Sequence, residues 1–155
     1  MLLSSVLSPT SILLPIKSEE RDSVIRELLE VMQFDSEEIS REKIYSAILE
    51  REAVSSTGIG EGVAIPHAKC DIQEEMVIAF GITEKPVDFH AMDGKPVRIV
   101  FLLLSRKNAA GPHIRMLANI ARLMRNDRFA KKILLCKTRG EVLHLITEEE
   151  SEETK

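Results

Sequence analysis

The sequence predicts a layered α/β fold in a single domain. Segments with apolar residues at helical spacing alternate along the chain with short apolar runs of the kind found in strands. The clearest run, residues 99–104, is apolar throughout, which is typical of a strand covered by helices on both faces. The 155 residues are enough for about one domain, and no Gly/Ser/Pro-rich linker divides them.

The first expected elements are a strand and a helix. Residues 11–16 (SILLPI) predict a short strand, and Pro15, which has no N–H to donate, confines it to an edge or a strand end. A helix is expected from Ser18 to Gln33, with Ser18 as its N-cap. Its buried face is indicated by four apolar residues at helical spacing: Ile25, Leu28, Leu29 and Met32.

A second helix is expected at about residues 40–53. Its buried face should carry Ile44, Ala47 and Ile48. The same spacing places Arg51 on that face, and an unpaired buried guanidinium would be very costly. Two interpretations remain open. Either the side chain reaches water or the carbonyls of its own helix end, or it points at an anion beside the following loop.

Two strands and a helix are expected in the next part of the chain. Residues 75–82 and 97–104 predict strands, and the Asp-Gly pair within residues 91–96 (AMDGKP) indicates a turn between them. A helix should begin at Pro112, a residue suited to a first helical position, with His113 in its first turn. Five residues are expected on its buried face: Ile114, Leu117, Ala118, Ala121 and Met124.

Two more helices are expected before the C-terminus. Residues 126–136 predict a helix capped by Asn126 or Asp127, and the last helix opens with the capping-box spacing of Thr138 and Glu141. Residues 148–155 form an acidic run with nothing to bury. We therefore expect a domain of residues 1–147 followed by a disordered tail.

Composition excludes several classes of function. A net charge of −4 and the low aromatic content, with no Trp, disfavour nucleic acid as a partner. No apolar stretch reaches the roughly 18 residues of a membrane-spanning helix, and the N-terminal segment lacks the basic residues of a signal peptide. We expect no membrane insertion and a cytoplasmic protein. Cys70 and Cys136 lack CxxC or zinc-ribbon spacing and are expected to be free thiols.

The segment STGIGEGVAIPHAK has the residues that a phosphohistidine site needs, although three glycines are also typical of a turn and a histidine at a helix start can simply be a cap. Glycine loses much conformational freedom when it is ordered, so we expect Gly58 and Gly60 to let backbone N–H groups converge on a phosphoryl group. His67 follows. The ordinary pKa of a histidine is about 6.5, so much of its imidazole is neutral at cytosolic pH and can act as a nucleophile. His113 at a helix start and Arg51 on an inward face would supply donors and positive charge.

Other motif interpretations find less support. GIGEG lacks the GxGxxG spacing of dinucleotide-binding loops and no GxxxxGK[ST] motif is present, so we expect no cofactor. A zinc site at His67 and Cys70 would lack a second pair of ligands, so no metal is expected. A Cys70 nucleophile paired with His67 is disfavoured because neighbours in sequence seldom reach the required geometry. His90 and His144 are interpreted as structural or surface residues.

The segment REAVSSTGIGEGVAIPHAK resembles the active-site segment of phosphotransferase-system enzyme IIA domains of the fructose/mannitol class. The resemblance extends from LSPTSILL (residues 7–14) to about Ile146. Two further segments, KPVDFHAMDGKPVRIVFLLL and HIRMLANIARLMRND, are similar to the nitrogen-regulatory branch of that family. The resemblance implies a single α/β domain with a central mixed five-stranded sheet flanked by helices on both sides.

The resemblance also implies residue roles and partners. His67 would accept the phosphoryl group through Nε2, His113 and Arg51 would support that group, and the Thr57 hydroxyl would lie near its oxygens. The donor would be a small histidine-containing phosphocarrier protein, itself phosphorylated from phosphoenolpyruvate by an enzyme I.

The chain departs from the family pattern at three places. Ala68 follows His67 where the family usually has Gly, residues 105–107 are Ser-Arg-Lys where it has Ala-Pro-Glu, and Ile114 replaces Leu. None of these changes removes a proposed chemical group. The change at residues 105–107 adds positive charge near a loop that could contact partners, so it bears on partner identity.

Three functions are compatible with these residues. The first is a phosphocarrier whose phosphorylation state regulates other proteins. In the second, His67 passes the phosphoryl group to a IIB cysteine during sugar uptake, although no IIB or membrane domain is attached here. The third is a protein-binding module without phosphotransfer, and the presence of both His67 and His113 argues against it.

Overall fold

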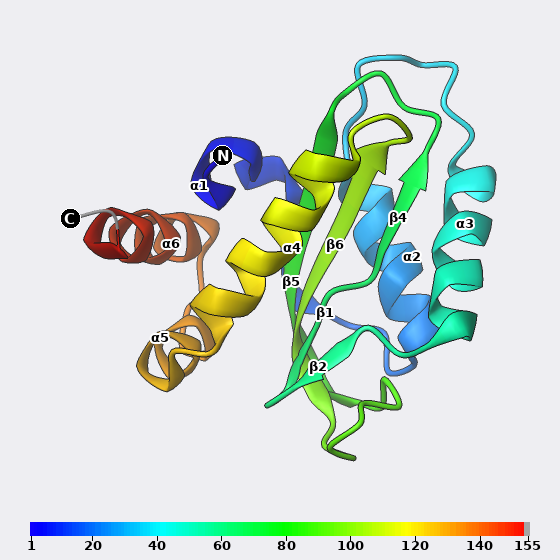
Figure 1. Ribbon diagram of the computed structural model, residues 1–155. Helices are drawn as coiled ribbons and strands as arrows, with labels where there is room; N and C mark the ends of the chain where they lie inside the picture. Colours follow the sequence, from blue (N-terminus) through cyan, green and yellow to red (C-terminus); the bar gives the residue numbers. More distant parts are fainter. Residues whose placement is uncertain (154–155) are drawn as a thin grey trace.

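A six-stranded mixed sheet lies at the centre of the computed structural model, which describes residues 1–153 (Figure 1). Its path is β1 (Ile12–Ile16), β5 (Met76–Val87), β6 (Val97–Arg106), β3 (Val63–Ala64) and β2 (Gly58–Gly60). The sixth strand, β4 (His67–Cys70), pairs with β6 in the parallel sense, as β3 does. β3 and β4 therefore lie one after the other along β6 and share one position in the sheet. The predicted mixed sheet is confirmed, with six strands in five positions.

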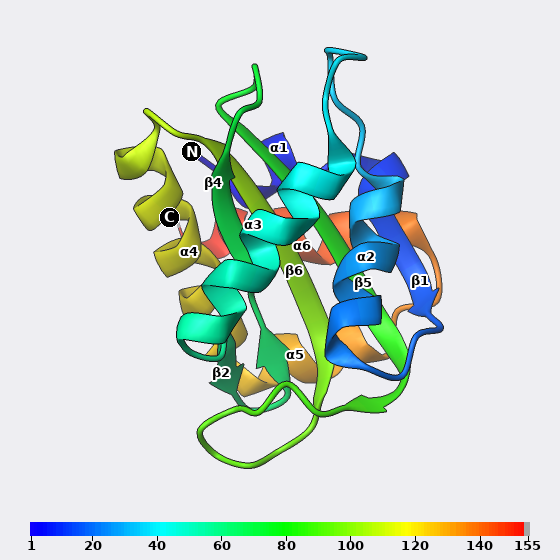
Figure 2. The same ribbon diagram turned by 90° about the vertical axis from the view of Figure 1, so that its right-hand side faces the viewer.

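Helices cover both faces of this sheet, as predicted. Figure 2 shows α2 (Arg21–Val31) and α3 (Arg41–Val54) on one face. The other face carries α1 (Leu3–Val6), α4 (Ala110–Met124), α5 (Asp127–Leu134) and α6 (Arg139–Glu153), with the short 3₁₀ helix η1 (Pro9–Ser11) leading into β1. Each face has its own apolar core, and the Phe80 and Phe101 rings, 4.9 Å apart, lie in the core on the α4 side.

The N-terminal elements confirm the strand and correct the helix cap. β1 is an edge strand, so Pro15 removes no hydrogen bond from the centre of the sheet. The first long helix begins at Arg21, and Ser18 does not cap it. Instead the Ser18 amide and hydroxyl donate to a carboxylate oxygen of Glu27, at 2.9 and 2.6 Å. Ser40 caps α3, accepting from the Lys43 amide.

The buried face of α4 differs from the expected one. The helix begins at Ala110, and Ile114 is 63% exposed. The side chains that face the sheet are His113, Met116, Ile120, Leu123 and Met124. Two faces of this helix carry apolar residues at helical spacing, and the face with Met116, Ile120 and Leu123 buries larger side chains than the one with two alanines. Pro112 still lies in the first turn, where a missing N–H costs no hydrogen bond.

The last two helices begin as predicted but the chain ends differently. Asn126 caps α5, and Glu141 and Thr138 form the predicted contacts at the start of α6. The expected disordered tail is wrong for residues 148–153, which continue α6 to Glu153; residues 154–155 lie outside the described part. The acidic run does bury one residue, since Glu150 is 2% exposed.

Glu150 ties the two ends of the chain together. Its carboxylate accepts from the backbone amides of Leu3 and Ser4 at 2.7 and 2.9 Å, and from the Asn119 side chain. These amides belong to the first turn of α1, where helix N–H groups have no partner within the helix. One carboxylate therefore satisfies two such donors at once.

We expect Glu150→Gln to destabilise the protein by about 1–3 kcal/mol, because the new NH₂ group replaces one carboxylate oxygen and places a donor against one of the two backbone donors. Urea unfolding followed by circular dichroism measures this. Glu152→Gln, on the exposed side of the same helix, is the matched control and should leave the midpoint unchanged. Equal midpoints for the two variants would show that the contact contributes nothing.

Candidate functional site

The two histidines singled out in the sequence lie side by side. His67 opens β4, opposite Leu103 of β6, and His113 lies in the first turn of α4. Their ring centroids are 5.3 Å apart and the ring planes are inclined by 61°. Residues 46 positions apart in the chain therefore form one pair, on the sheet face that α4 covers.

The His67 ring is held in one tautomer by its own backbone. Its Nδ1 lies 2.7 Å from the carbonyl oxygen of Ile65. A carbonyl can only accept, so Nδ1 carries the proton and the lone pair of the neutral ring is on Nε2. Burial lowers the pKa of His67 below its ordinary value; the Ile65 contact opposes this, and the positive charge of Arg51 reinforces it. His67 is thus a neutral nucleophile at physiological pH, with Nε2 available.

His113 is buried and has a different partner. Its Nδ1 lies 2.7 Å from the Ser105 hydroxyl oxygen, in β6. Burial lowers the pKa of His113 to about 4, and positive charge at His67 and Lys69 acts in the same direction. The neutral ring therefore has one N–H. Because Nδ1 is occupied, Nε2 is the nitrogen left for a group bound beside His67.

Arg51 makes the helix-end contact that was one of the two interpretations of its position. The half-buried side chain donates from Nη1 to the carbonyl oxygen of Ser55, at 3.0 Å, just beyond the end of α3. That is the helix-end contact expected of a structural arginine. Its charge also acts on His67, whose pKa it lowers. The guanidinium therefore lies near His67 and is held through Nη1 by Ser55 alone among the described residues, by its carbonyl oxygen and, at 3.5 Å, its hydroxyl oxygen.

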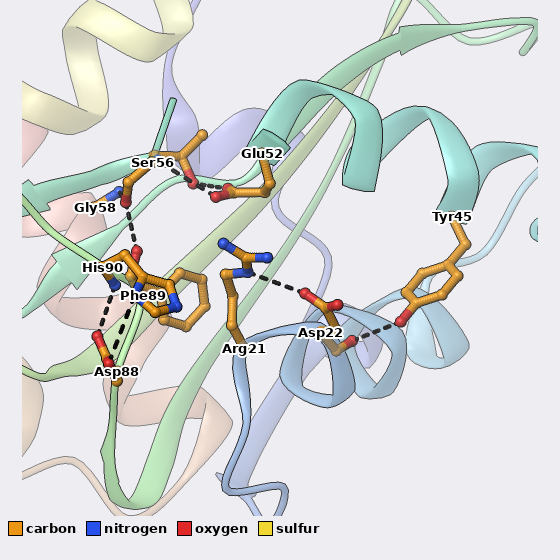
Figure 3. Close-up of polar contacts among 10 residues, drawn as sticks. Arg21, Asp22, Tyr45, Glu52, Ser56, Gly58, Asp88, Phe89 and His90 are labelled. Atoms are coloured by element: carbon orange, nitrogen blue, oxygen red, sulfur yellow. Dashed lines mark hydrogen bonds and ion pairs between the residues drawn. The ribbon is translucent and has the colours of Figure 1, made fainter. Parts of the chain in front are cut away.

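The Thr57 hydroxyl is engaged by a buried carboxylate. Glu52 and Thr57 are both buried, and the hydroxyl of Thr57 donates to Glu52, which also accepts from the Thr57 amide at 3.4 Å. Figure 3 shows the Glu52 carboxylate pointing toward the segment that carries Ser56 and Gly58. The one hydroxyl proton of Thr57 is thus used within the protein, and the expected role of this hydroxyl as a donor to phosphoryl oxygens does not fit the arrangement.

Gly58 and Gly60 build a hairpin instead of an anion site. The Gly58 amide donates to the Ser56 hydroxyl, whose own proton goes to the Phe89 carbonyl oxygen (Figure 3). A Cβ on Gly58 would lie 2.8 Å from the Cβ of Ala91, and Gly60 has a φ of 92°. Gly60 also lies beside the Asp93 carboxylate, which disfavours a second anion there. The Gly58 amide is already bonded within the protein and Gly60 lies beside a carboxylate, which does not fit the expected convergence of these amides on a phosphoryl group.

Sequence reasoning missed Glu52 and Ser105. For Glu52 a signal existed, because it follows Ile48 by four residues and so continues the buried stripe of α3 as well as Arg51 does. Ser105 ends the apolar run of β6, two residues after Leu103 and therefore on the same face of the sheet. A polar residue at the buried end of such a strand was the available signal.

The low pKa of His113 predicts a specific pH dependence of stability. The native pKa, about 4, lies below the unfolded value, so between about pH 6.5 and pH 4 the unfolded chain binds a proton that the native chain does not. This contribution of about 2–3 kcal/mol is fully present above pH 6.5 and is lost as pH falls through that window. We expect His113→Asn to show a shallower loss of unfolding free energy than wild type in urea titrations at pH 7 and pH 4.5.

The exposed His144 supplies the control for this measurement. His144→Asn should follow the wild-type pH dependence, since its side chain is 74% exposed. A His113→Asn variant with the wild-type slope would contradict the assignment of this pH dependence to the buried ring.

Other chemistry receives little support from the described residues. Burial raises the pKa of Cys70 to about 11, so this thiol is protonated at neutral pH and is a poor nucleophile. Within residues 1–153, no group of three or more His, Cys, Asp or Glu side chains is arranged to hold a metal ion. No helix in that range has the length and apolar content needed to cross a membrane.

Comparisons with known proteins give one consistent similarity. Residues 5–149 match the family model described as phosphoenolpyruvate-dependent sugar phosphotransferase system, EIIA 2. A nitrogen regulatory protein of Bradyrhizobium diazoefficiens is 35% identical, with 86% of this chain and 86% of that protein covered. The fructose-specific EIIABC component of Bacillus subtilis is 33% identical over 96% of this chain, which spans only 23% of that protein's length.

A solved structure extends this similarity to the fold. The crystal structure of the nitrogen regulatory protein IIA-Ntr from Neisseria meningitidis is 28% identical to this chain. It superposes with a TM-score of 0.86 and covers 93% of this chain and 98% of its own.

Proposed function

The chain belongs to the EIIA type 2 family of the phosphoenolpyruvate-dependent sugar phosphotransferase system, and we propose that it is a phosphocarrier that accepts a phosphoryl group on His67. The observation that carries the proposal is the tautomer of His67. Its Nδ1 proton is bound by the Ile65 carbonyl, which leaves the Nε2 lone pair free beside the His113 ring.

The transfer step needs no reagent beyond donor and acceptor. The Nε2 lone pair of His67 attacks the phosphorus of a phosphohistidine on the donor and forms an N–P bond. The donor's N–P bond breaks, and its electron pair returns to the donor imidazole. His67 bears positive charge as the bond forms, and the Ile65 carbonyl at Nδ1 stabilises it. We assign the donor to a small histidine-containing phosphocarrier protein.

Two side chains are positioned to stabilise the transferred group. His113 uses Nδ1 for its contact with Ser105, so Nε2 is left to contact the phosphoryl group. Because the His113 ring is neutral, it does not repel the positive charge of Arg51. Arg51 is held by the Ser55 carbonyl and can exchange that acceptor for phosphoryl oxygens, which bind a guanidinium more strongly. The charge of the phosphoryl group is then met by donors from α3 and from α4.

The relatives favour regulation as the purpose of this phosphorylation. The Bradyrhizobium relative, 86% of which is covered, is named a nitrogen regulatory protein, as is the Neisseria structure. We therefore propose that the phosphorylation state of His67 controls binding to a regulated protein. A pull-down that compares wild type with His67→Ala under phosphorylating conditions would identify proteins that distinguish the two states.

Sugar transport is the second candidate, and the fructose-specific EIIABC relative favours it. In that function the phosphoryl group would pass from His67 to a cysteine of a IIB domain. Incubation of the phosphorylated protein with a purified fructose-type IIB domain distinguishes the candidates. Rapid transfer of the label to IIB supports transport, and label that stays on this chain supports the regulatory function.

The proposal is tested by phosphorylation in a defined mixture. The protein is incubated with phosphoenolpyruvate, enzyme I and the histidine phosphocarrier, and its intact mass is measured. We expect the gain of one phosphoryl group that is labile in acid and stable in alkali, as an N–P bond requires. Omission of the phosphocarrier should prevent the gain. No acid-labile group under complete conditions would overturn the proposal.

A further inference from the structure

Ser105 carries a buried hydroxyl group that contacts a ring nitrogen of His113. It is 0% exposed and lies in β6, between Lys69 of β4 and Met76 of β5. Within residues 1–153 its oxygen has one side-chain hydrogen bond, to His113 Nδ1 at 2.7 Å. The hydroxyl is therefore committed to this histidine.

The number of protons decides the direction of that bond. Neutral His113 has one N–H, and Ser105 has one O–H. If Nδ1 donated to the hydroxyl, the buried hydroxyl proton would have no acceptor among the described residues. If the hydroxyl donates to Nδ1, its proton is satisfied and the ring proton moves to Nε2. A buried donor without an acceptor costs about 1–3 kcal/mol, so the second arrangement is favoured.

We propose that Ser105 is a positioning residue that holds His113 as the Nε2–H tautomer, so that this ring donates a hydrogen bond to the phosphoryl group on His67. The inference rests on the proposed function for its purpose, and on the Ser105 contact for its geometry.

The two rings then have complementary roles although they are the same residue type. A carbonyl fixes the proton of His67 on Nδ1 and leaves a lone pair on Nε2, and a hydroxyl gives His113 the opposite tautomer. One Nε2 can attack phosphorus, and the other can donate to a phosphoryl oxygen. Because His113 is neutral, only the correct tautomer supplies a donor. The opposite tautomer would present a lone pair to the anion and repel it.

The tautomer is measured directly in the unphosphorylated protein. Two-dimensional ¹H–¹⁵N spectra of the histidine rings distinguish a protonated nitrogen from one with a lone pair. In wild type we expect a lone pair on His113 Nδ1 and a proton on Nε2, with the reverse in His67. Ser105→Ala should give His113 a mixture of both tautomers while His67 is unchanged. A wild-type His113 with its proton on Nδ1 overturns the inference whether or not any variant folds.

The phosphorylated protein supplies the functional measurement. Ser105→Ala should shorten the half-life of the phosphohistidine by about 5- to 10-fold, the effect of weakening one hydrogen bond. Ser105→Thr keeps the hydroxyl and should restore the wild-type half-life and tautomer. Thr83→Val, which removes another buried hydroxyl from the sheet, is the matched control and should change neither. A Ser105→Ala half-life equal to wild type would contradict the inference.

The failure of this inference is distinguishable from failure of the proposed function. If wild type takes up no phosphoryl group, the proposed function fails. If wild type is phosphorylated on His67 but His113 has the wrong tautomer, only the role of Ser105 fails.

Discussion

Replacing His67 with alanine is expected to abolish phosphorylation of the protein, with no acid-labile phosphoryl group detectable by intact mass. The expected effect is complete because no other group in the site can take the role. In the tautomer proposed above, the lone pair of His113 is on Nδ1, where Ser105 binds it, and the Cys70 thiol is protonated, with its pKa raised to about 11 by burial. The fold should persist, since His67 is only half-buried and, within residues 1–153, its ring makes one hydrogen bond, to the Ile65 carbonyl of its own segment.

An exposed histidine provides the control. His90 lies in the loop between β5 and β6 with its side chain 69% exposed, and His90→Ala should be phosphorylated like wild type. Far-ultraviolet circular dichroism of both variants checks that the fold is retained. A His67→Ala protein that still gains a phosphoryl group at the wild-type rate would refute the assignment of the acceptor.

Arg51→Ala is expected to slow phosphorylation by about 100-fold or more while leaving the fold intact, since loss of one donor to a developing phosphoryl charge has that magnitude. The effect on stability of losing the contact seen in the free protein is expected to be smaller. The hydrogen bond to the Ser55 carbonyl stabilises the fold by about 0.5–1.5 kcal/mol, and the 3.5 Å contact with the Ser55 hydroxyl is weaker. If Arg51 binds the phosphoryl group, Arg51→Ala changes the phosphorylation rate most. If Arg51 is structural, the substitution changes the free energy of unfolding most. Rapid-quench phosphorylation kinetics and urea unfolding of the same variant measure both.

Arg41 is the matched structural arginine in the same helix. It lies at the start of α3, and its guanidinium donates to the backbone oxygens of Leu29 and Met32 at the end of α2. Arg41→Ala should lower the free energy of unfolding and leave the phosphorylation rate unchanged. If Arg51→Ala behaves in the same way, Arg51 is a structural residue and the proposed role in phosphoryl binding is wrong.

Three of the six strands, β1, β5 and β6, were predicted because their signals are local, whereas the short β2, β3 and β4 were not. A continuous apolar run and a proline determine much about β6 and β1 without reference to the rest of the chain. The buried face of α4 could not be predicted from its own sequence alone. Its sequence offers two apolar faces, and the choice depends on which one the sheet accepts, as the exposure of Ile114 shows.

The site followed the same division. His67, His113 and Arg51 were predicted as site residues from residue type, spacing and the family resemblance, and the structure brings the two histidines within contact distance. The hydrogen-bond partners of these side chains come from distant segments or from backbone, as with Ser105 for His113 and the Ile65 carbonyl for His67. Glycine spacing was misleading because a hairpin and an anion loop need the same backbone freedom.

The contact of Glu150 with the first helix makes the two termini interdependent. A shortened protein that stops at residue 147, where the sequence suggested the domain ends, would lose the acceptor for the amides of Leu3 and Ser4. The wholly buried Leu3 side chain depends on that anchoring for its place in the core. Trimming one end of the polypeptide would thus loosen the opposite end, and any minimal stable version must keep both.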